Sequence, residues 1–347
     1  MLVLGIETSC DETAAAVVEN GRTILSNIIH SQIKTHIPYG GVVPELASRE
    51  HLVKIRPIVD QAFQTAGKTL EDMDGIAVTA GPGLIGSLLV GLTYAKALAY
   101  SKDKALVAVN HIEGHIYSVC FDHPDVEFPA LALVVSGGHT NLFWVESARG
   151  DFSNLSYRLV GKTRDDAAGE AYDKVAKLLG LQYPGGPVID RLARLGNPQA
   201  IRFAIPKISD RALDFSFSGV KTEVLRLVKK RNLAPKDEDE SKQDAERLDL
   251  IASFQESVVH MLWSTTSKAV ESLQPQSLIL SGGVAANSRL KEFLREKTEE
   301  AGIRFYVPKP IFTSDNAAMI AAAGTAKLLR GEKADFAYSP DPNMRLA

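Results

Sequence analysis

The 347-residue chain has only two cysteines, Cys10 and Cys120, and no CxxC pair. Two cysteines are too few for a disulfide framework, and the lack of CxxC argues against a zinc ribbon or a dithiol redox site. The first residues, MLVLGIETSC, have no basic leader and reach an acid at Glu7, so they predict a buried strand and not a secretory signal. We therefore expect the protein in the reducing cytoplasm.

Two common nucleotide motifs are also missing. The sequence contains no GxxxxGK[ST] and no GxGxxG followed by an acidic ribose ligand, which disfavours P-loop and dinucleotide-binding proteins. The formal net charge is −3, so the chain as a whole does not attract nucleic acid. Any contact with RNA must therefore be local.

One long run without charge extends from Gly75 to Ala95. A membrane span is one interpretation of its length. However, Gly81, Pro82 and Gly83 interrupt the run, and such a turn exposed to lipid would leave backbone polar groups unpaired. We therefore predict a strand, a turn and a helix here, and no membrane association.

The residues that are present predict a large folded core in two similar halves, with 45% hydrophobic and 23% charged residues. Apolar strands at 2–8, 13–20 and 22–29 are separated by tight turns, and the same order restarts near residue 130 with PALALVVS, NLFWVES and NLSYRLVG. The offset is roughly 125 to 130 residues, which indicates a duplicated α/β fold. The alternative is a single α/β sheet whose halves resemble each other by chance.

The remaining periodicities complete both halves. Further strands are predicted at 75–79, 277–281 and in RFYVP, and helices at about 49–66, 84–100, 166–179, 248–273, 287–300 and 316–329. We expect an N-terminal lobe of residues 1–125, joined by a C-terminal helix within 315–347. Residues 126–314 would form the second lobe, with an insertion at 181–247 that is rich in Gly, Pro and charge. Each lobe would present a hairpin turn to a shared cleft.

Glycine-rich turns follow two of the apolar strands. Gly137 and Gly138 lie in VVSGGHT, and Gly282 and Gly283 in ILSGGVAAN just before a helix that begins near Asn287. Without Cβ atoms, such turns let backbone N–H groups approach an anion, and a helix N-terminus favours phosphate. Together with the polar turn TSCDE, they predict a nucleotide in the cleft.

A second set of small residues predicts packing and not ligand binding. Gly83, Ser87 and Gly91 recur at the spacing of one helix face. A smooth face of this kind favours close packing over ligand binding. The packing partner could be internal or another subunit.

A pair of histidines, His111 and His115, lies in NHIEGHIYS. On a helix, residues four apart project from one face, at a spacing that chelates a transition metal, and Asn110 could cap this helix with Glu113 in a capping-box arrangement. The rival interpretation is a zinc protease with HExxH. Glu113 is two residues after His111 and about 200° around the helix from it, so it points away from the metal and is a poor general base.

The ordered motifs GIETSCDET, NHIEGH, VVSGGHT, DDAAGEAYDK, YPGGP, SGGVAAN and SDNAAM resemble those of the bacterial TsaD family, which makes threonylcarbamoyl-adenosine in tRNA and is similar to the catalytic subunit of the KEOPS complex. The resemblance covers essentially the whole chain. It implies an actin-like (ASKHA) ATPase fold and transfer of a threonylcarbamoyl group from threonylcarbamoyl-AMP to N6 of adenosine 37, in tRNAs reading codons that begin with A. AMP would be released.

The resemblance also implies the site residues. One transition metal per subunit, iron(II) in the first place or zinc, would be held by His111, His115 and Asp315. The nucleotide part of the donor would contact the following residues: Val134, Val135, Ser136, Gly137, Gly138, Asp173, Gly186, Asp190 and Asn287.

We expect Asp11 or Glu12, on the first hairpin turn, to remove the proton from the N6 amine of the adenosine. The alternative is that these two acids only stabilise the turn. The resemblance implies two protein partners, a paralogous TsaB-type subunit and a TsaE-type ATPase. Three other functions stay open: a metal-dependent glycoprotease, the label under which the family was long known; a small-molecule kinase of the same fold; and a noncatalytic nucleotide-binding scaffold.

Overall fold

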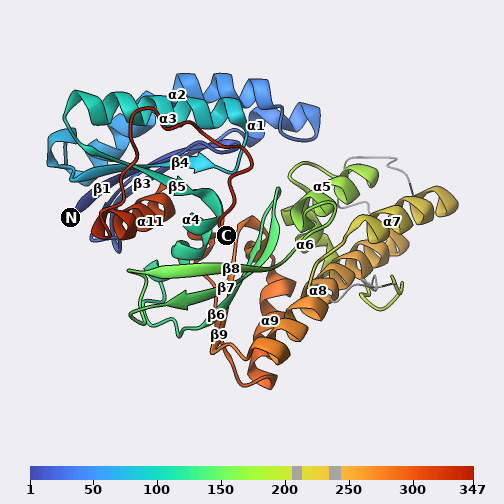
Figure 1. The fold of residues 1–347 in the computed structure, drawn as a ribbon. Coiled ribbons are helices and arrows are strands. Elements are labelled where there is room, and N and C mark those ends of the chain that lie inside the picture. Colours follow the sequence, from blue (N-terminus) through green and yellow to red (C-terminus); the bar gives the residue numbers. More distant parts are fainter. Residues whose placement is uncertain (205–212, 234–243) are drawn as a thin grey trace. The chain divides into compact units, whose positions relative to one another are not determined.

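The computed structural model describes residues 1–204, 213–233 and 244–347, and the chain divides into two compact units (Figure 1). Unit 1 comprises residues 1–128, 146–157 and 308–347, and unit 2 comprises residues 129–145 and 158–307. Each unit has its own hydrophobic core. The parts of the expected insertion at 205–212 and 234–243 lie outside the described residues.

Unit 1 is built on a five-stranded mixed sheet in the order β3-β2-β1-β4-β5. Its strands are β1 (Leu2–Glu7), β2 (Glu12–Glu19), β3 (Thr23–Ser31), β4 (Gly75–Gly81) and β5 (Ala105–Asn110). The first three form an antiparallel meander, whereas β4 and β5 run parallel to β1. The C-terminal ends of β1 and β5 therefore lie at the same edge of the sheet, and both lead into candidate site residues.

Helices cover both faces of this sheet. Figure 1 shows α2 (Pro44–Ala66) and α3 (Ile85–Ser101) on one side, and α11 (Ala317–Leu329) on the other. Side chains alternate along β1 accordingly, because Leu4 and Ile6 join the core under α2 and α3, while Gly5 faces α11. The other short elements of the unit are α1 (Ile33–His36), α4 (His111–Tyr117), α10 (Pro310–Thr313), and the 3₁₀ turns at Ile37–Tyr39, Leu70–Asp72 and Ser118–Phe121.

Unit 2 repeats the same sheet. Its order is β10-β9-β6-β7-β8, formed by β6 (Ala130–Val135), β7 (Thr140–Ser147), β8 (Leu155–Lys162), β9 (Ser277–Ser281) and β10 (Arg304–Tyr306). As in unit 1, the first strand pairs antiparallel with the second and parallel with the fourth, and the fourth and fifth strands are parallel. The equivalence of β1 to β5 with β6 to β10 confirms the predicted duplication.

The helices of unit 2 pack around the long helix α8 (Ala245–Leu273), which contacts α6 (Gly185–Ala193), α7 (Ser218–Arg231) and α9 (Ser288–Glu300). Helix α5 (Ala168–Leu178) packs on α6 and α7. A 3₁₀ turn at Gly283–Ala286 joins β9 to α9. Thus α5 carries Asp173, α6 carries Gly186 and Asp190, and α9 begins directly after Asn287.

Most predicted elements are confirmed within a few residues. The largest boundary difference is α2, which begins at Pro44 and not near Arg49, because a proline is well suited to the first turn of a helix. Residues 75–95 form strand, turn and helix as predicted. Among the described residues, no helix combines the length and apolar character that crossing a membrane requires.

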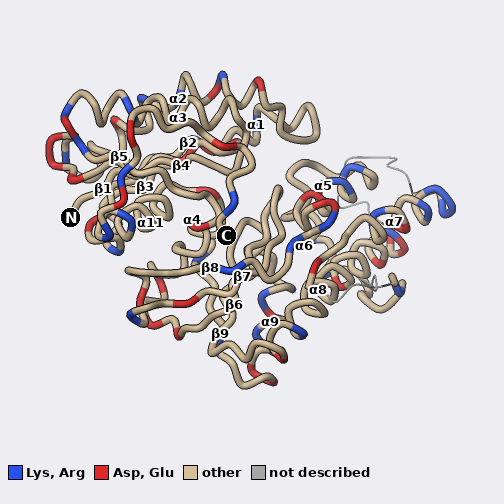
Figure 2. The backbone as a smooth tube through the Cα atoms, in the orientation of Figure 1, with Lys and Arg blue, Asp and Glu red and all other residues tan. Residues whose placement is uncertain are grey.

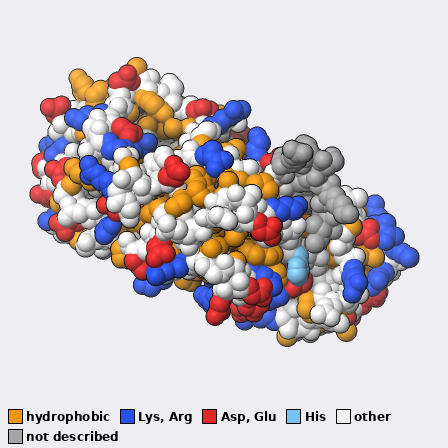
Figure 3. Space-filling view, turned by 60° about the horizontal axis from the view of Figure 1, so that its bottom comes forward, with side chains coloured by type: hydrophobic (Ala, Val, Ile, Leu, Met, Phe, Trp, Pro, Cys, Tyr) orange, Lys and Arg blue, Asp and Glu red, His pale blue; other side chains and the backbone are white. Residues whose placement is uncertain are grey.

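Charges of both signs are interspersed along the chain (Figure 2) and over the face in Figure 3. Several basic side chains are paired locally: Lys221 with Asp166, Arg226 with Glu223, and Arg231 with Glu246. The two exposed pairs, Arg226–Glu223 and Arg231–Glu246, contribute little to stability. They do reduce the local positive field, which agrees with a chain that has no global attraction to RNA.

Candidate metal centre and nucleotide site

Helix α4 presents the histidine pair as the sequence predicts. The side chain of Asn110 caps the helix, accepting hydrogen bonds from the backbone N–H groups of Ile112 and Glu113 at 2.9 and 3.3 Å. The rings of His111 and His115 lie on one face with their centroids 4.7 Å apart. The predicted capping box is wrong, because the Glu113 carboxylate turns away from Asn110 to Tyr157 and Lys327. The prediction that Glu113 points away from the metal site is consistent with these contacts.

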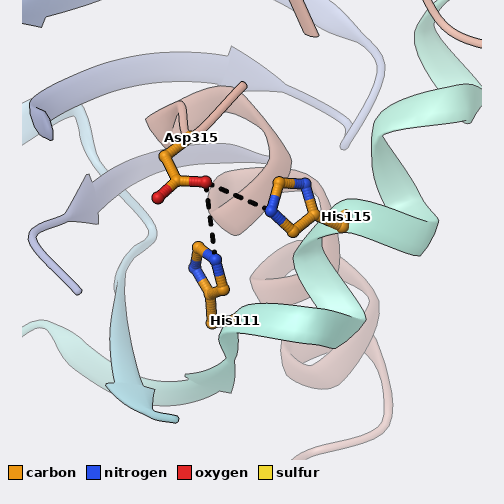
Figure 4. A group of neighbouring side chains, drawn as sticks. All are labelled: His111, His115 and Asp315. Carbon is orange, nitrogen blue, oxygen red and sulfur yellow. Dashed lines mark ion pairs between the residues drawn. The ribbon is translucent and has the colours of Figure 1, made fainter. Parts of the chain in front are cut away.

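The third nominated residue joins the pair from a distant part of the sequence (Figure 4). Asp315 directly precedes Asn316, whose side chain caps α11 by accepting from the N–H of Met319. One carboxylate oxygen of Asp315 lies 3.5 Å from Nε2 of His111 and 3.2 Å from Nε2 of His115. The three donor atoms lie within 4.8 Å of one another.

These residues fit a metal ion. His115 is fully buried; its Nε2 faces the Asp315 carboxylate at 3.2 Å, and its Nδ1 has no hydrogen-bond partner among the described residues. A metal ion between Nε2 and the carboxylate would satisfy both groups. Two imidazoles and one carboxylate form a donor set that suits iron or zinc and leaves coordination positions open.

Glu7, at the end of β1, supports His111 from the other side of the ring. Its carboxylate accepts from Nδ1 of His111 at 3.0 Å, from the hydroxyl of Thr79 at 2.6 Å, and from the N–H of Ser9 at 2.5 Å. A proton on Nδ1 leaves Nε2 free to bind a metal, as second-sphere carboxylates do in many metal sites. The sequence motifs do not single out Glu7, although a lone acid at the end of an otherwise apolar strand is an available signal.

The charges around His111 set its protonation state. Burial lowers the pKa of His111, but the carboxylates of Asp315 and Glu7 act more strongly together and raise it to about 9. Burial lowers the pKa of His115, so this ring is neutral. Without a metal, an imidazolium at His111 therefore balances part of the carboxylate charge at neutral pH.

This arrangement predicts proton release when a metal binds. At pH 7, binding of Zn²⁺ should release about one proton, because the His111 imidazolium must become a neutral ligand. Calorimetric titration in buffers of different ionisation enthalpy measures the number. The metal-free protein should also lose stability as pH rises from the ordinary histidine value of 6.5 to about 9, since a raised pKa stabilises the fold only while the proton is bound.

Glu7→Gln is the matched variant for this titration. Removing one of the two carboxylates should lower the pKa of His111 and reduce the number of protons released at pH 7. Equal proton release by both proteins would contradict the assigned electrostatics.

Close packing brings the first turn against α3. An added Cβ at Gly91 would lie 2.2 Å from the Thr8 hydroxyl oxygen, and one at Gly83 would lie 2.6 Å from the carbonyl oxygen of Ser9. The Thr8 hydroxyl also donates to the carbonyl of Ser87 at 2.9 Å. The small-residue face predicted from these three positions therefore packs internally, and it holds the turn that follows β1.

This turn carries Asp11 and Glu12. Glu12 is half-buried and accepts a hydrogen bond from the Ser31 hydroxyl at 3.1 Å. Burial and the neighbouring charges of Asp11 and Asp315 raise the pKa of Glu12 well above its ordinary value. A carboxyl group with a raised pKa beside a second carboxyl group is a useful arrangement for proton transfer.

The candidate nucleotide residues come together within unit 2. The N–H of Gly169 in α5 donates to the carbonyl of Ser136 at 3.2 Å, and the carboxylate of Asp173 accepts from the N–H of Gly185 at 2.7 Å. Asp190 accepts from the N–H and hydroxyl of Ser288 at 3.1 and 2.9 Å. The first turns of α5, α6 and α9 are thereby tied into one cluster beside the ends of β6 and β9.

The parts of this cluster differ in their access to a ligand. Val134 and Val135 are fully buried and Ser136 is only 9% exposed, so the accessible part of the segment is Gly137 and Gly138. Added Cβ atoms at Gly137, Gly138 and Gly186 would meet nothing within 4 Å, so the main chain there borders open space.

Three of the polar residues predicted to bind the nucleotide also make hydrogen bonds within the protein. Asp173 and Asp190 accept the bonds described above, and Asn287 caps α9 and donates to Gln255. A ligand would have to share or replace these bonds.

Comparison with known proteins identifies the family of the chain. A family model described as TsaD, tRNA N6-adenosine threonylcarbamoyltransferase, matches residues 23–322. A protein of that name from Anaeromyxobacter sp. (strain Fw109-5) is 52% identical over 347 residues and is covered completely, as is this chain. Another, from Clostridium perfringens (strain 13 / Type A), is 51% identical over 345 residues, which are 99% of this chain and 98% of the relative.

Solved structures with far less sequence similarity show the fold. Component A of (R)-2-hydroxyglutaryl-CoA dehydratase from Acidaminococcus fermentans aligns with a TM-score of 0.54 at 15% identity, over 95% of this chain and 99% of that one. Full-length HypF, in its phosphate- and nucleotide-bound form, aligns with a TM-score of 0.58 at 14% identity, over 94% of this chain and 46% of that one. The predicted actin-like ATPase fold is confirmed.

Proposed function

The chain belongs to the TsaD family of tRNA N6-adenosine threonylcarbamoyltransferases, and we infer that it transfers a threonylcarbamoyl group to N6 of an adenosine in tRNA, forming t6A. This conclusion rests on sequence identities of 51 and 52% over the full length of proteins of that name. The convergence of His111, His115 and Asp315 supports it. The donor is threonylcarbamoyl-AMP, and the amine attacks its carbamoyl carbon with AMP as the leaving group. The acceptor is adenosine 37, which lies in an unpaired loop where a base can be reached without opening a duplex.

A direct test is AMP release. The purified protein with threonylcarbamoyl-AMP should release AMP in step with nucleoside modification when unmodified tRNA is added. A small-molecule kinase would instead consume ATP, and a noncatalytic scaffold would bind the donor without turning it over. AMP release that is indifferent to tRNA would count against the transferase.

The nucleotide part of the donor binds at the turn Ser136–Gly138 and at the beginnings of α6 and α9. The open main chain at Gly137 and Gly186 supports this site, because N–H groups can approach a phosphate where a Cβ is absent. Asp173, Asp190 and Asn287 offer acceptors and donors for ribose and base. Preorganised N–H groups would also stabilise the negative charge that develops on departing AMP.

Gly137→Ala tests the nucleotide site. The added Cβ meets no protein atom within 4 Å, so the free energy of unfolding should change by less than about 0.5 kcal/mol. The methyl group occupies the space of the ligand, so the Kd of AMP should rise by about tenfold or more, equivalent to about 1.4 kcal/mol. Gly219→Ala in α7, at a glycine whose Cβ would also meet nothing, is the control and should leave the Kd unchanged. Equal affinities in all three proteins would remove the turn from the site.

The metal ligands are His111, His115 and Asp315, with iron(II) as the native ion and zinc as a substitute. When bound, the ion supplies a Lewis acid for the donor's carbonyl group. Glu7 keeps Nε2 of His111 available and orients the ring. Elemental analysis of protein purified without added metal would distinguish iron from zinc.

Asp11 and Glu12 take up the proton that the attacking amine loses. The raised pKa of Glu12, to which the neighbouring Asp11 contributes, supports a role of this pair in proton transfer. For the glycoprotease alternative, Glu113 is not placed to act as an HExxH-type base. Glu113 is paired with Lys327 and Tyr157 on the other side of α4.

A TsaB-type paralogous subunit docks on α2 and α3, and a TsaE-type ATPase completes the assembly. Four exposed apolar side chains support the first contact: Leu52, Val53, Ile85 and Leu89, which we call the α2/α3 apolar face. Their exposed fractions of 66, 65, 48 and 47% are high for such residues, and apolar patches on a protein surface often mark interfaces.

Leu52→Asp/Leu89→Asp tests this surface. The double variant should keep its stability but lose association with the partner by at least about a hundredfold, because two charges would be buried without partners. Light scattering of the mixed proteins measures the association. Tyr100→Asp, further along α3 and 75% exposed, is the control. Undiminished association of the double variant would place the partner elsewhere.

A further inference from the structure

The main chain of the turn between β1 and β2 is held from outside by two hydrogen bonds. Nε2 of His51, from α2, lies 3.0 Å from the carbonyl oxygen of Cys10. The N–H of Gln32, just after β3, donates to the carbonyl of Asp11 at 2.9 Å. The peptide groups on both sides of Asp11 are therefore fixed by residues that are not part of the turn.

The hydrogen-bond partners define the tautomer of His51. A carbonyl oxygen only accepts, so Nε2 carries the proton and Nδ1 has the lone pair. The Thr13 hydroxyl donates to Nδ1 at 2.8 Å. Burial lowers the pKa of His51, which keeps the ring in this neutral form.

A second buried histidine fixes Gln32. The N–H of Val43 donates to Nδ1 of His36 at 3.3 Å, so Nε2 of His36 donates to the side-chain oxygen of Gln32, also at 3.3 Å. The amide nitrogen of Gln32 is then directed to the carbonyl of Ala47 and to Nδ1 of His51, at 3.4 Å each. These donors and acceptors form one consistent hydrogen-bond network from the start of α2 to the turn.

The side chains in this hydrogen-bond network are polar although they are buried. His36, His51 and Thr13 are fully buried, and Gln32 is 1% exposed. Aliphatic side chains would fill the same volume without the cost of desolvating polar atoms. What the polar network provides in return is a defined geometry at the carbonyls of Cys10 and Asp11.

We propose that His51 is a positioning residue for the transfer reaction, which holds the Cys10 carbonyl so that the carboxyl groups of Asp11 and Glu12 are aimed at the reacting amine. The proposal rests on the proposed role of these two acids. His51 acts through the turn and touches neither substrate nor metal.

His51→Gln and His51→Asn form a matched pair for the test. The amide nitrogen of Gln can take the place of Nε2 and donate to Cys10, whereas the shorter Asn side chain cannot reach it. His51→Asn should lower kcat by roughly 10- to 100-fold, since small displacements of catalytic groups have effects of this size. His51→Gln should restore most of the rate. The KM for the donor, the bound metal and the Tm should be similar in both variants, and His30→Leu, which removes a half-buried histidine paired with Glu50, should keep the wild-type rate.

Glu12→Gln distinguishes a failure of the positioning role of His51 from a failure of the proposed role of Asp11 and Glu12. If Glu12→Gln is slow and His51→Asn adds little to it in the double variant, both residues act through one element, as proposed. If Glu12→Gln is slow but His51→Asn is as fast as wild type, the positioning role is refuted and the turn keeps its function. If Glu12→Gln and Asp11→Asn both keep the wild-type rate, the proposed function of the turn fails and the proposal with it.

Discussion

The double variant His111→Ala/His115→Ala is expected to lose its metal and to lower the rate of threonylcarbamoyl transfer by roughly a thousandfold or more, since a Lewis acid contributes several kcal/mol to such reactions. Both rings project from one face of α4 onto the Asp315 carboxylate, and one carboxylate alone cannot hold the ion. Metal content and the transfer rate should be measured on the same preparation.

Helix α4 should survive this change, because it remains capped by Asn110. The control is His30→Ala/His260→Ala, which deletes two histidines outside the cluster. Near-normal activity of a metal-free double variant would contradict a role for the metal in the reaction.

The substitution Gly5→Ala should destabilise the protein by about 2 to 3 kcal/mol, near the upper part of the range for overpacked cores. A Cβ at Gly5 would lie 2.2 Å from the carbonyl oxygen of Ala317 and 2.9 Å from the Cβ of Ala321. The obstacle is the backbone of α11, so relief requires the whole helix to move away from β1. Asp315 lies two residues before Ala317, and metal affinity should therefore fall together with the free energy of unfolding.

Gly114→Ala is the matched comparison. Its Cβ would lie 2.8 Å from Cδ1 of Ile320, the flexible end of a side chain in the same helix α11. A rotamer change can relieve this contact, so the loss of stability should be clearly smaller. Denaturant titrations of both variants give the difference, and an equal or larger effect at Gly114 would contradict the close approach of β1 to α11.

The sequence predicted local features of the site well and long-range ones only through resemblance. The spacing of His111 and His115, with Asn110 before them, is a helical pattern that a few residues specify. Asp315 is brought to them by the packing of α11 on β1 and α4, which depends on small residues such as Gly5 and Gly114. No local pattern reveals such a contact.

The contacts of Glu7 and His51 also could not be predicted from local sequence patterns. Glu7 could have been noticed as an acid in a buried strand, but its partner His111 follows only from the parallel arrangement of β1, β4 and β5. His51 looks like one polar residue of an amphipathic helix, and its bond to Cys10 depends on how α2 crosses the β1–β2 hairpin. The duplication, by contrast, was visible because both halves repeat the same order of strands and turns.

The most direct test of the account is the formation of modified nucleoside itself. Purified protein, its TsaB- and TsaE-type partners, threonylcarbamoyl-AMP and unmodified tRNA should be combined, and t6A quantified by mass spectrometry. The account predicts t6A with the wild-type protein and almost none with folded His111→Ala/His115→Ala. Absence of t6A with the wild type, under conditions in which the relative from Clostridium perfringens produces it, would contradict the assignment.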